Sequence, residues 1–165
     1  MDFLLNGFTE AFNLLLNGNL ETYSAIKATL YTSSVSILFA VLVGFPLGFI
    51  LGFYDFRGRK ILRLLSDTAL AMPTVAIGLI LYAFITRNGP LGSLNLLFTL
   101  KAVMLGQFVL ALPIIISLTA SVVENMEKKH YLTILNLRLA PAKLVCCVLY
   151  ELRYALMVVI ATAYG

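Results

Sequence analysis

Charged residues are scarce in this sequence. Only 12% of its 165 residues are Asp, Glu, Lys or Arg, and 61% are hydrophobic, which gives a mean hydropathy of +0.96. A soluble domain carries about 25% charged residues, because charge covers its surface. The few charges here gather in short stretches, as expected where a charge at the bilayer centre costs at least ~2.5 kcal/mol. The composition therefore excludes an ordinary soluble domain and predicts a membrane protein.

Histidine and cysteine are nearly absent as well. His130 is the only histidine, and Cys146 and Cys147 are adjacent, which makes them poor disulfide partners. No Cys or His at ligand spacing accompanies them, so we interpret both as small apolar side chains on a helix. The sequence also lacks a phosphate-binding glycine loop, an HExxH motif and a Ser/His/Asp arrangement. We therefore expect no metal site, no cofactor and no enzymatic activity in this chain.

Three long uncharged runs dominate the sequence. The first lies between Lys27 and Asp55 and contains 27 uncharged residues, the second covers about 61–86, and the third, 102–123, contains 22. Each can provide the ~20 residues that a membrane-spanning helix needs. Pro73 lies near the middle of the second run and should break or kink it, because proline removes a backbone donor. The predicted fold is an all-α, polytopic membrane helical bundle.

A fourth apolar run begins near Leu144 but contains Glu151 and Arg153. Only twelve uncharged residues follow, from Tyr154 to Gly165, fewer than the ~20 of a full span. We therefore expect three full spans plus a partial fourth, in a transmembrane domain over residues 27–165 that is incomplete at its C-terminus.

The first 26 residues form a separate predicted segment. Asp2 follows Met1 directly and no basic stretch is present, unlike in a cleaved signal peptide. Apolar residues recur at helical spacing within 2–16: Phe3, Leu4, Leu5, Phe8, Phe12, Leu15 and Leu16. We predict a short amphipathic helix that lies at the membrane surface, in an extracytoplasmic or interfacial segment over residues 1–26.

Small residues mark the second half of the first run. Gly44, Gly48 and Gly52 repeat every four residues around Pro46. Such spacing allows a partner helix to approach closely. Glycine is also simply tolerated in membrane helices, and the sequence leaves both interpretations open.

The charge that is present is mostly basic, with a formal net charge of +4. No basic stripe runs through a soluble segment, so nucleic acid is not an expected partner. Two basic clusters follow the first and third runs: Arg57, Arg59, Lys60 and Arg63, and then Lys128, Lys129, Arg138 and Lys143. An excess of Lys and Arg marks the cytoplasmic side. The N-terminus and residues 87–101 are therefore predicted outside, and the loops near 55–63 and 124–143 inside.

Four stretches together carry a family resemblance. They are ALAMPTVAIGL at 69–79, GPLGSL at 89–94, GQFVLALP at 106–113 and LYELRY at 149–154. In this order and spacing they resemble the permease subunit of tungstate-type ABC importers, a type I importer family related to the molybdate and sulfate permeases. The resemblance covers about residues 25–165.

The resemblance implies a set of partners and a location. Two permease copies would pair as a homodimer on two ABC ATPase subunits, which hydrolyse the ATP, and an extracytoplasmic oxyanion-binding protein would deliver the anion. The complex would lie among the lipids of a bacterial or archaeal cytoplasmic membrane. The alternative is a small helical membrane protein, or a non-functional permease fragment, with an assembly or regulatory role and no transport.

By the same resemblance, residues 132–143 would form the coupling helix that docks on the ATPase. An amphipathic helix can present a row of leucines to a groove in a partner. The residues of this predicted contact are Leu132, Leu135, Leu137, Arg138, Leu139 and Lys143. Arg138 and Leu139 stand where the family usually has glycine and alanine, and arginine adopts a positive φ far less readily than glycine.

A translocation path is only partly visible in the sequence. No Lys or Arg lies in the middle of a run, so an anion would have to meet helix N-termini and neutral polar groups. The candidates for such a lining are Pro73, Thr74, Gln107, Pro113, Ser117 and Thr119. The alternative for each is an ordinary proline kink, or a hydroxyl that bonds to its own backbone.

Overall fold

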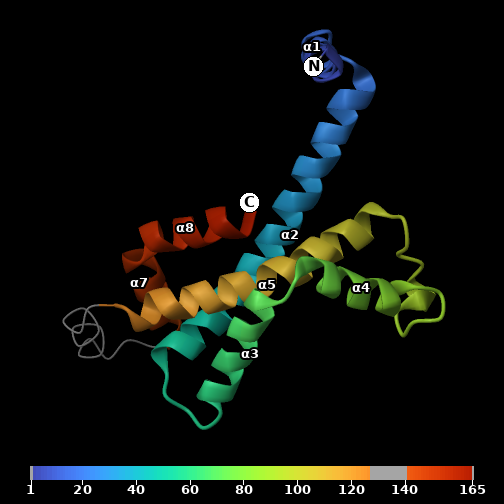
Figure 1. Cartoon of the computed structure of the whole chain (residues 1–165). Helices are drawn as coiled ribbons and strands as arrows, with labels where there is room; N and C mark the ends of the chain where they lie inside the picture. The colour runs from blue at the N-terminus through green and yellow to red at the C-terminus, as the bar shows by residue number, and fades with distance from the viewer. Residues whose placement is uncertain (1, 127–140, 165) are drawn as a thin grey trace.

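The computed structural model describes residues 2–126 and 141–164 (Figure 1). The secondary-structure elements within these two ranges are helices, as the uncharged runs predict. In chain order they are α1 (Asp2–Leu16), α2 (Leu20–Phe53), α3 (Arg59–Ala71), α4 (Thr74–Ile85), the short 3₁₀ helix η1 (Gly92–Leu94), α5 (Leu100–Glu124), α7 (Pro141–Glu151) and α8 (Arg153–Tyr164).

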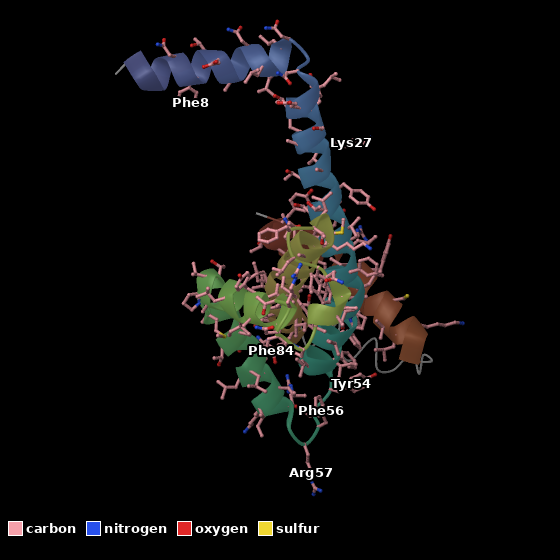
Figure 2. All side chains as sticks on the ribbon, turned by 90° about the vertical axis from the view of Figure 1, so that its right-hand side faces the viewer. Phe8, Lys27, Tyr54, Phe56, Arg57 and Phe84 are labelled. Carbon is pink, nitrogen blue, oxygen red and sulfur yellow. The ribbon has the colours of Figure 1, made fainter. Side chains whose placement is uncertain are left out.

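The N-terminal helix α1 has the bounds that its periodicity predicts. It is separated from α2 by a tight turn in which Gly18 adopts a φ of +66°, a value that glycine tolerates best. The Asn19 side chain then accepts a hydrogen bond from the Glu21 backbone N–H at 2.9 Å and caps α2. Figure 2 shows α1 turning sharply away from α2, at the end farthest from the other helices.

Helices α2 and α5 cross to form the centre of the molecule (Figure 1). Each is long and apolar enough to cross a membrane, and each continues through an internal proline, Pro46 or Pro113. Fully buried side chains meet at the crossing, among them Ala40 on α2 and Ile115 on α5. The predicted first and third runs therefore agree with the structure, although α2 already begins at Leu20, ahead of Lys27.

The second predicted run is broken into two helices. Helix α3 ends at Ala71, Pro73 follows, and α4 leaves at an angle of 101° to α3. Proline cannot donate to the preceding turn, and the residue before it avoids the helical region. Met72 accordingly has extended backbone, with φ −67° and ψ 139°. The break predicted at Pro73 is confirmed.

The fourth run is also bent. Helices α7 and α8 meet at an angle of 80°, with Leu152 between them. Helix α7 packs on the ends of α2 and α5 through Leu144 and Val148, which contact Phe49, Phe53 and Val123. Two helices of the described residues can span a membrane alone, and up to four spans result if each bent pair counts as one.

Candidate functional site

Glycines bring α2 and α5 into close contact. A Cβ added to Gly48 would lie 2.6 Å from Thr119 Cβ and 2.8 Å from the Ile116 carbonyl oxygen. One added to Gly44 would lie 2.7 Å from Ile115 Cγ2, and Gly52 is equally confined. No side chain fits at these distances, so of the two interpretations of the glycine repeat, the structure supports close helix packing.

Polar side chains join the same two helices beyond the glycines. Gln107 Nε2 on α5 donates to Ser33 Oγ on α2 at 3.1 Å. The buried Ser36 hydroxyl donates to the Met104 carbonyl oxygen at 2.9 Å. Hydrogen bonds between helices contribute about 1 kcal/mol each in a membrane. They also fix the rotation of α2 against α5.

An ion-pair network joins α3 to the other end of α5. Arg59 Nη2 lies 2.7 Å from Glu124 Oε1, and Arg63 Nη2 lies 3.6 Å from Glu124 Oε2. Arg63 also pairs with Asp67 at 3.5 Å, as its spacing in the sequence indicates. These side chains are 19–45% exposed, so they lie at the rim of the bundle and not in its centre.

Helix α5 also contributes one backbone carbonyl and two serine hydroxyls to this network. Arg63 Nη1 donates to the Ser117 carbonyl oxygen at 2.7 Å, and its Nη2 donates to Ser121 Oγ. The Ser117 hydroxyl in turn donates to Asp67. Helix α3 has no buried residue of its own. These polar contacts therefore do much to hold α3 against α5.

The predicted path residues fall into separate environments. Pro73 and Thr74 lie exposed at the α3–α4 bend, whereas Gln107 contacts α2 and Ser117 contacts α3. Thr119 is fully buried against Gly48. In this single chain the structure does not bring the set together around one cavity, and the translocation path stays a prediction.

Two of these residues keep an unpaired polar atom. Gln107 Oε1 and Thr119 Oγ1 are buried and have no hydrogen-bond partner among the described residues. Pro113 interrupts the backbone hydrogen bonding of α5 between these two positions. An unsatisfied buried polar group is costly, so both atoms are of interest for any path that passes α5.

Most of the predicted coupling contact lies outside the described residues. This applies to Leu132, Leu135, Leu137, Arg138 and Leu139. Lys143 is described and is exposed near the start of α7. Helix α7, which begins at Pro141, packs on the ends of α2 and α5.

The contacts of Glu124 are not among those that the sequence predicts. Arg59 and Glu124 are 65 positions apart, and their pairing could not be read from local spacing. A signal was nevertheless present, since Glu124 follows the third run directly and the basic cluster at 57–63 follows the first. The first and third runs cross the membrane in the same direction in the predicted topology, so their two ends lie on the same side.

The architecture defines a class of protein. Two long apolar helices pack through glycines, and two bent helix pairs attach to them. Among the described residues no group of His, Cys, Asp and Glu could hold a metal ion. The molecule is a polytopic helical membrane protein.

Comparison with known proteins identifies the family. Residues 44–163 match the family described as binding-protein-dependent transport system inner membrane component. The chain is 54% identical, over its whole length and 69% of the relative, to the tungstate uptake system permease protein TupB of Campylobacter jejuni. It is 30% identical to a probable anion ABC transporter permease of Haloferax volcanii, over 86% of this chain and 61% of that protein.

A third relative is the tungstate uptake system permease protein TupB of Peptoclostridium acidaminophilum, which is 26% identical over the whole chain and 72% of that protein. The chain belongs to the binding-protein-dependent transport system inner membrane component family. It is a multi-pass membrane protein, and these relatives are named as permeases.

Proposed function

We propose that the chain is the membrane-spanning permease subunit of an ABC importer for tungstate. The observation that carries this proposal is the 54% identity, over the whole length of the chain, to a permease named for tungstate uptake. The second relative is named only for an anion, which agrees with an oxyanion as the substrate class. Molybdate is the closest competing substrate, because it has the same charge and geometry.

The chain would act with other subunits. Two copies would pair around the path, two ATPase subunits would bind at the cytoplasmic side, and an extracytoplasmic binding protein would deliver the anion. The family description, which names transport dependent on a binding protein, supports the last of these partners. ATP hydrolysis belongs to the separate ATPase subunit in this proposal.

Coupling would use residues 132–143 as a helix that docks in a groove of the ATPase. The packing of α7 supports this assignment, because Leu144 and Val148 follow that segment directly and contact Phe49 and Val123. A displacement of the docked segment would therefore reach both central helices through α7. Lys143, exposed at this junction, would remain available to the partner.

The anion would pass neutral polar groups and not fixed cations. Gln107 offers the clearest candidate, because its amide bridges two helices and keeps one buried oxygen unpaired. The N-terminus of α4 at Pro73 and Thr74 has no side-chain cap, which leaves backbone N–H groups for an anion. Pro113, Ser117 and Thr119 complete the proposed set on α5.

The orientation follows from the basic residues. The α2–α3 loop and residues 124–143 would face the cytoplasm, and the N-terminus would lie outside. Helix α1, in which Phe8 and Leu16 are highly exposed, would lie on the outer surface of the membrane as part of the segment over residues 1–26. Residues 27–165 would make up the transmembrane domain.

A gene deletion tests the proposed function in the source organism. Loss of the gene should lower cellular tungsten at low external tungstate, measured by elemental mass spectrometry, and the restored gene should recover it. Unchanged tungsten, with the importer's other subunits present, would instead favour the alternative, a small membrane protein with an assembly or regulatory role. Growth on several sulfur sources serves as the control for sulfate uptake.

A further inference from the structure

The corner between α2 and α3 contains a cationic pocket of about 800 Å³. Figure 2 shows this corner at the lower end of the molecule, with Arg57 at its tip. Its charged lining consists of four cations and two carboxylates: Arg57, Arg59, Lys60, Arg63, Asp55 and Glu124. The pocket therefore has an excess of positive charge.

The excess charge lies on two of the four cations. Arg59 is paired with Asp55 and Glu124, and Arg63 is paired with Glu124 and with the Ser117 carbonyl oxygen. Arg57 and Lys60 are exposed, and within residues 2–126 and 141–164 neither forms an ion pair. These two side chains remain available to an external anion.

An apolar groove of about 220 Å³ lies beside the cationic pocket, between α2 and α3. Leu47, Leu62 and Leu65 line it, and Phe56 lines both the groove and the pocket. The two hollows are thus adjacent parts of one surface. One part is suited to an anion, and the other to a hydrocarbon chain.

Exposed apolar side chains of α3 continue the apolar surface. Ile61, Leu64 and Leu65 are each at least 59% exposed, and no residue of α3 is buried. A helix with a basic end and an exposed apolar face is typical of the boundary between headgroups and acyl chains. The position of this corner, at the end of the membrane-spanning α2, places it at that boundary.

We propose that the α2–α3 corner binds an anionic phospholipid. Arg57 and Lys60 hold the lipid phosphate, and one acyl chain lies along the groove that begins at Phe56. A free phosphate ion would leave the apolar groove empty, whereas a lipid occupies both parts. This inference adds a lipid-binding site to the proposed permease. The assignment of the lipid to the inner leaflet rests on the proposed orientation, whereas the site itself does not.

Native mass spectrometry of the full chain in detergent tests the proposal by titration with phosphatidylglycerol and with phosphatidylcholine. Phosphatidylglycerol should bind more tightly, and the double variant Arg57→Gln/Lys60→Gln should bind it about 30-fold more weakly. Each cation near a membrane surface contributes about 1 kcal/mol, a factor of about 5. The matched control Lys27→Gln/Lys101→Gln removes the same charge from exposed positions elsewhere and should bind as the unchanged protein does.

A fluorescence measurement locates the lipid. The chain contains no tryptophan, so Phe56→Trp introduces a single reporter at the shared wall of pocket and groove. Brominated phosphatidylglycerol should quench it more than brominated phosphatidylcholine, and the double variant should lose this preference. Glycerol phosphate, which has the phosphate but no acyl chain, should compete poorly.

Three results would overturn the proposal. The double variant could bind phosphatidylglycerol as tightly as its control does, or glycerol phosphate could compete as well as the lipid, which would indicate a site for free anions. The double variant could also weaken capture of the ATPase while leaving lipid binding unchanged, which would indicate a protein contact. Because neither binding measurement uses tungstate or ATP, a failure of uptake would leave this test intact.

Discussion

Arg59 on α3 donates to Glu124 at the end of α5 over 2.7 Å, although the two residues are 65 positions apart in the chain. Glu124 also faces Arg63, so one carboxylate joins two successive turns of α3 to α5. Since α3 has no buried residue, its position depends on these contacts more than on apolar packing.

Loss of the Glu124 carboxylate should loosen α3. We expect Glu124→Gln to lower the free energy of unfolding by about 1 kcal/mol, because partly exposed ion pairs contribute little more than this. Thermal unfolding of the purified protein, monitored by the circular dichroism signal of its helices, measures the change. Glu10→Gln, on the exposed helix α1, is the control and should have no effect. Equal stability of the two variants would show that α3 is held in another way.

The glycine contacts predict a strong steric effect. Gly48→Ala should destabilise the protein by about 1–3 kcal/mol, because its Cβ would lie against Thr119 and the Ile116 carbonyl oxygen. Gly78→Ala is the matched control, since a Cβ there meets no atom within 4 Å and alanine favours helix. A Gly48→Ala variant as stable as Gly78→Ala would contradict the close crossing of α2 and α5.

A substitution at Thr119 tests whether its hydroxyl belongs to the translocation path. We expect Thr119→Val to lower uptake, because Thr119 belongs to the proposed path, and to raise stability by about 1 kcal/mol, because it replaces a buried, unpaired hydroxyl with a methyl group of similar size. Denaturation and uptake are measured on the same preparation. Unchanged uptake in the more stable variant would show that the Thr119 hydroxyl has no part in the path.

The predicted orientation can be tested by labelling. In a background with Cys146 and Cys147 replaced by serine, a single cysteine at Ser93 should react with an impermeant thiol reagent added outside intact cells. One at Lys128 should react only after the membrane is opened. The reverse pattern would show that the basic clusters do not face the cytoplasm.

The coupling segment is tested by crosslinking to the ATPase. A photoreactive group at Leu135 should capture the ATPase, and one at Ser93 should not. Arg138→Gly should increase capture, because glycine allows the turn after the docked helix at lower cost. Weaker capture by Arg138→Gly would show that the segment docks in a different register.

Much of the helical fold could be predicted because long uncharged runs have few alternatives in a membrane. The third run, 102–123, lies within one or two residues of α5, and the break at Pro73 follows from a missing backbone donor. The angle of 101° at that break could not be predicted, since it depends on where α3 and α4 meet α5.

The candidate site was less accessible to sequence reasoning. The pair Arg63 and Asp67 follows from local helix geometry, whereas Arg59 with Glu124 requires the relative placement of two helices. The glycine repeat suggested a close contact without naming its partner. Thr119 and Ile116 became identifiable only when α2 and α5 were placed against each other.

The most direct test of the central claim is tungstate uptake by the reconstituted importer. Liposomes that contain the chain and its ATPase, with the binding protein on the opposite side from the nucleotide, are incubated with radioactive tungstate. We predict accumulation that requires ATP and the binding protein, and that sulfate in excess does not abolish. Absence of ATP-dependent accumulation in a complex that still binds its ATPase, or transport of sulfate in preference to tungstate, would contradict the account.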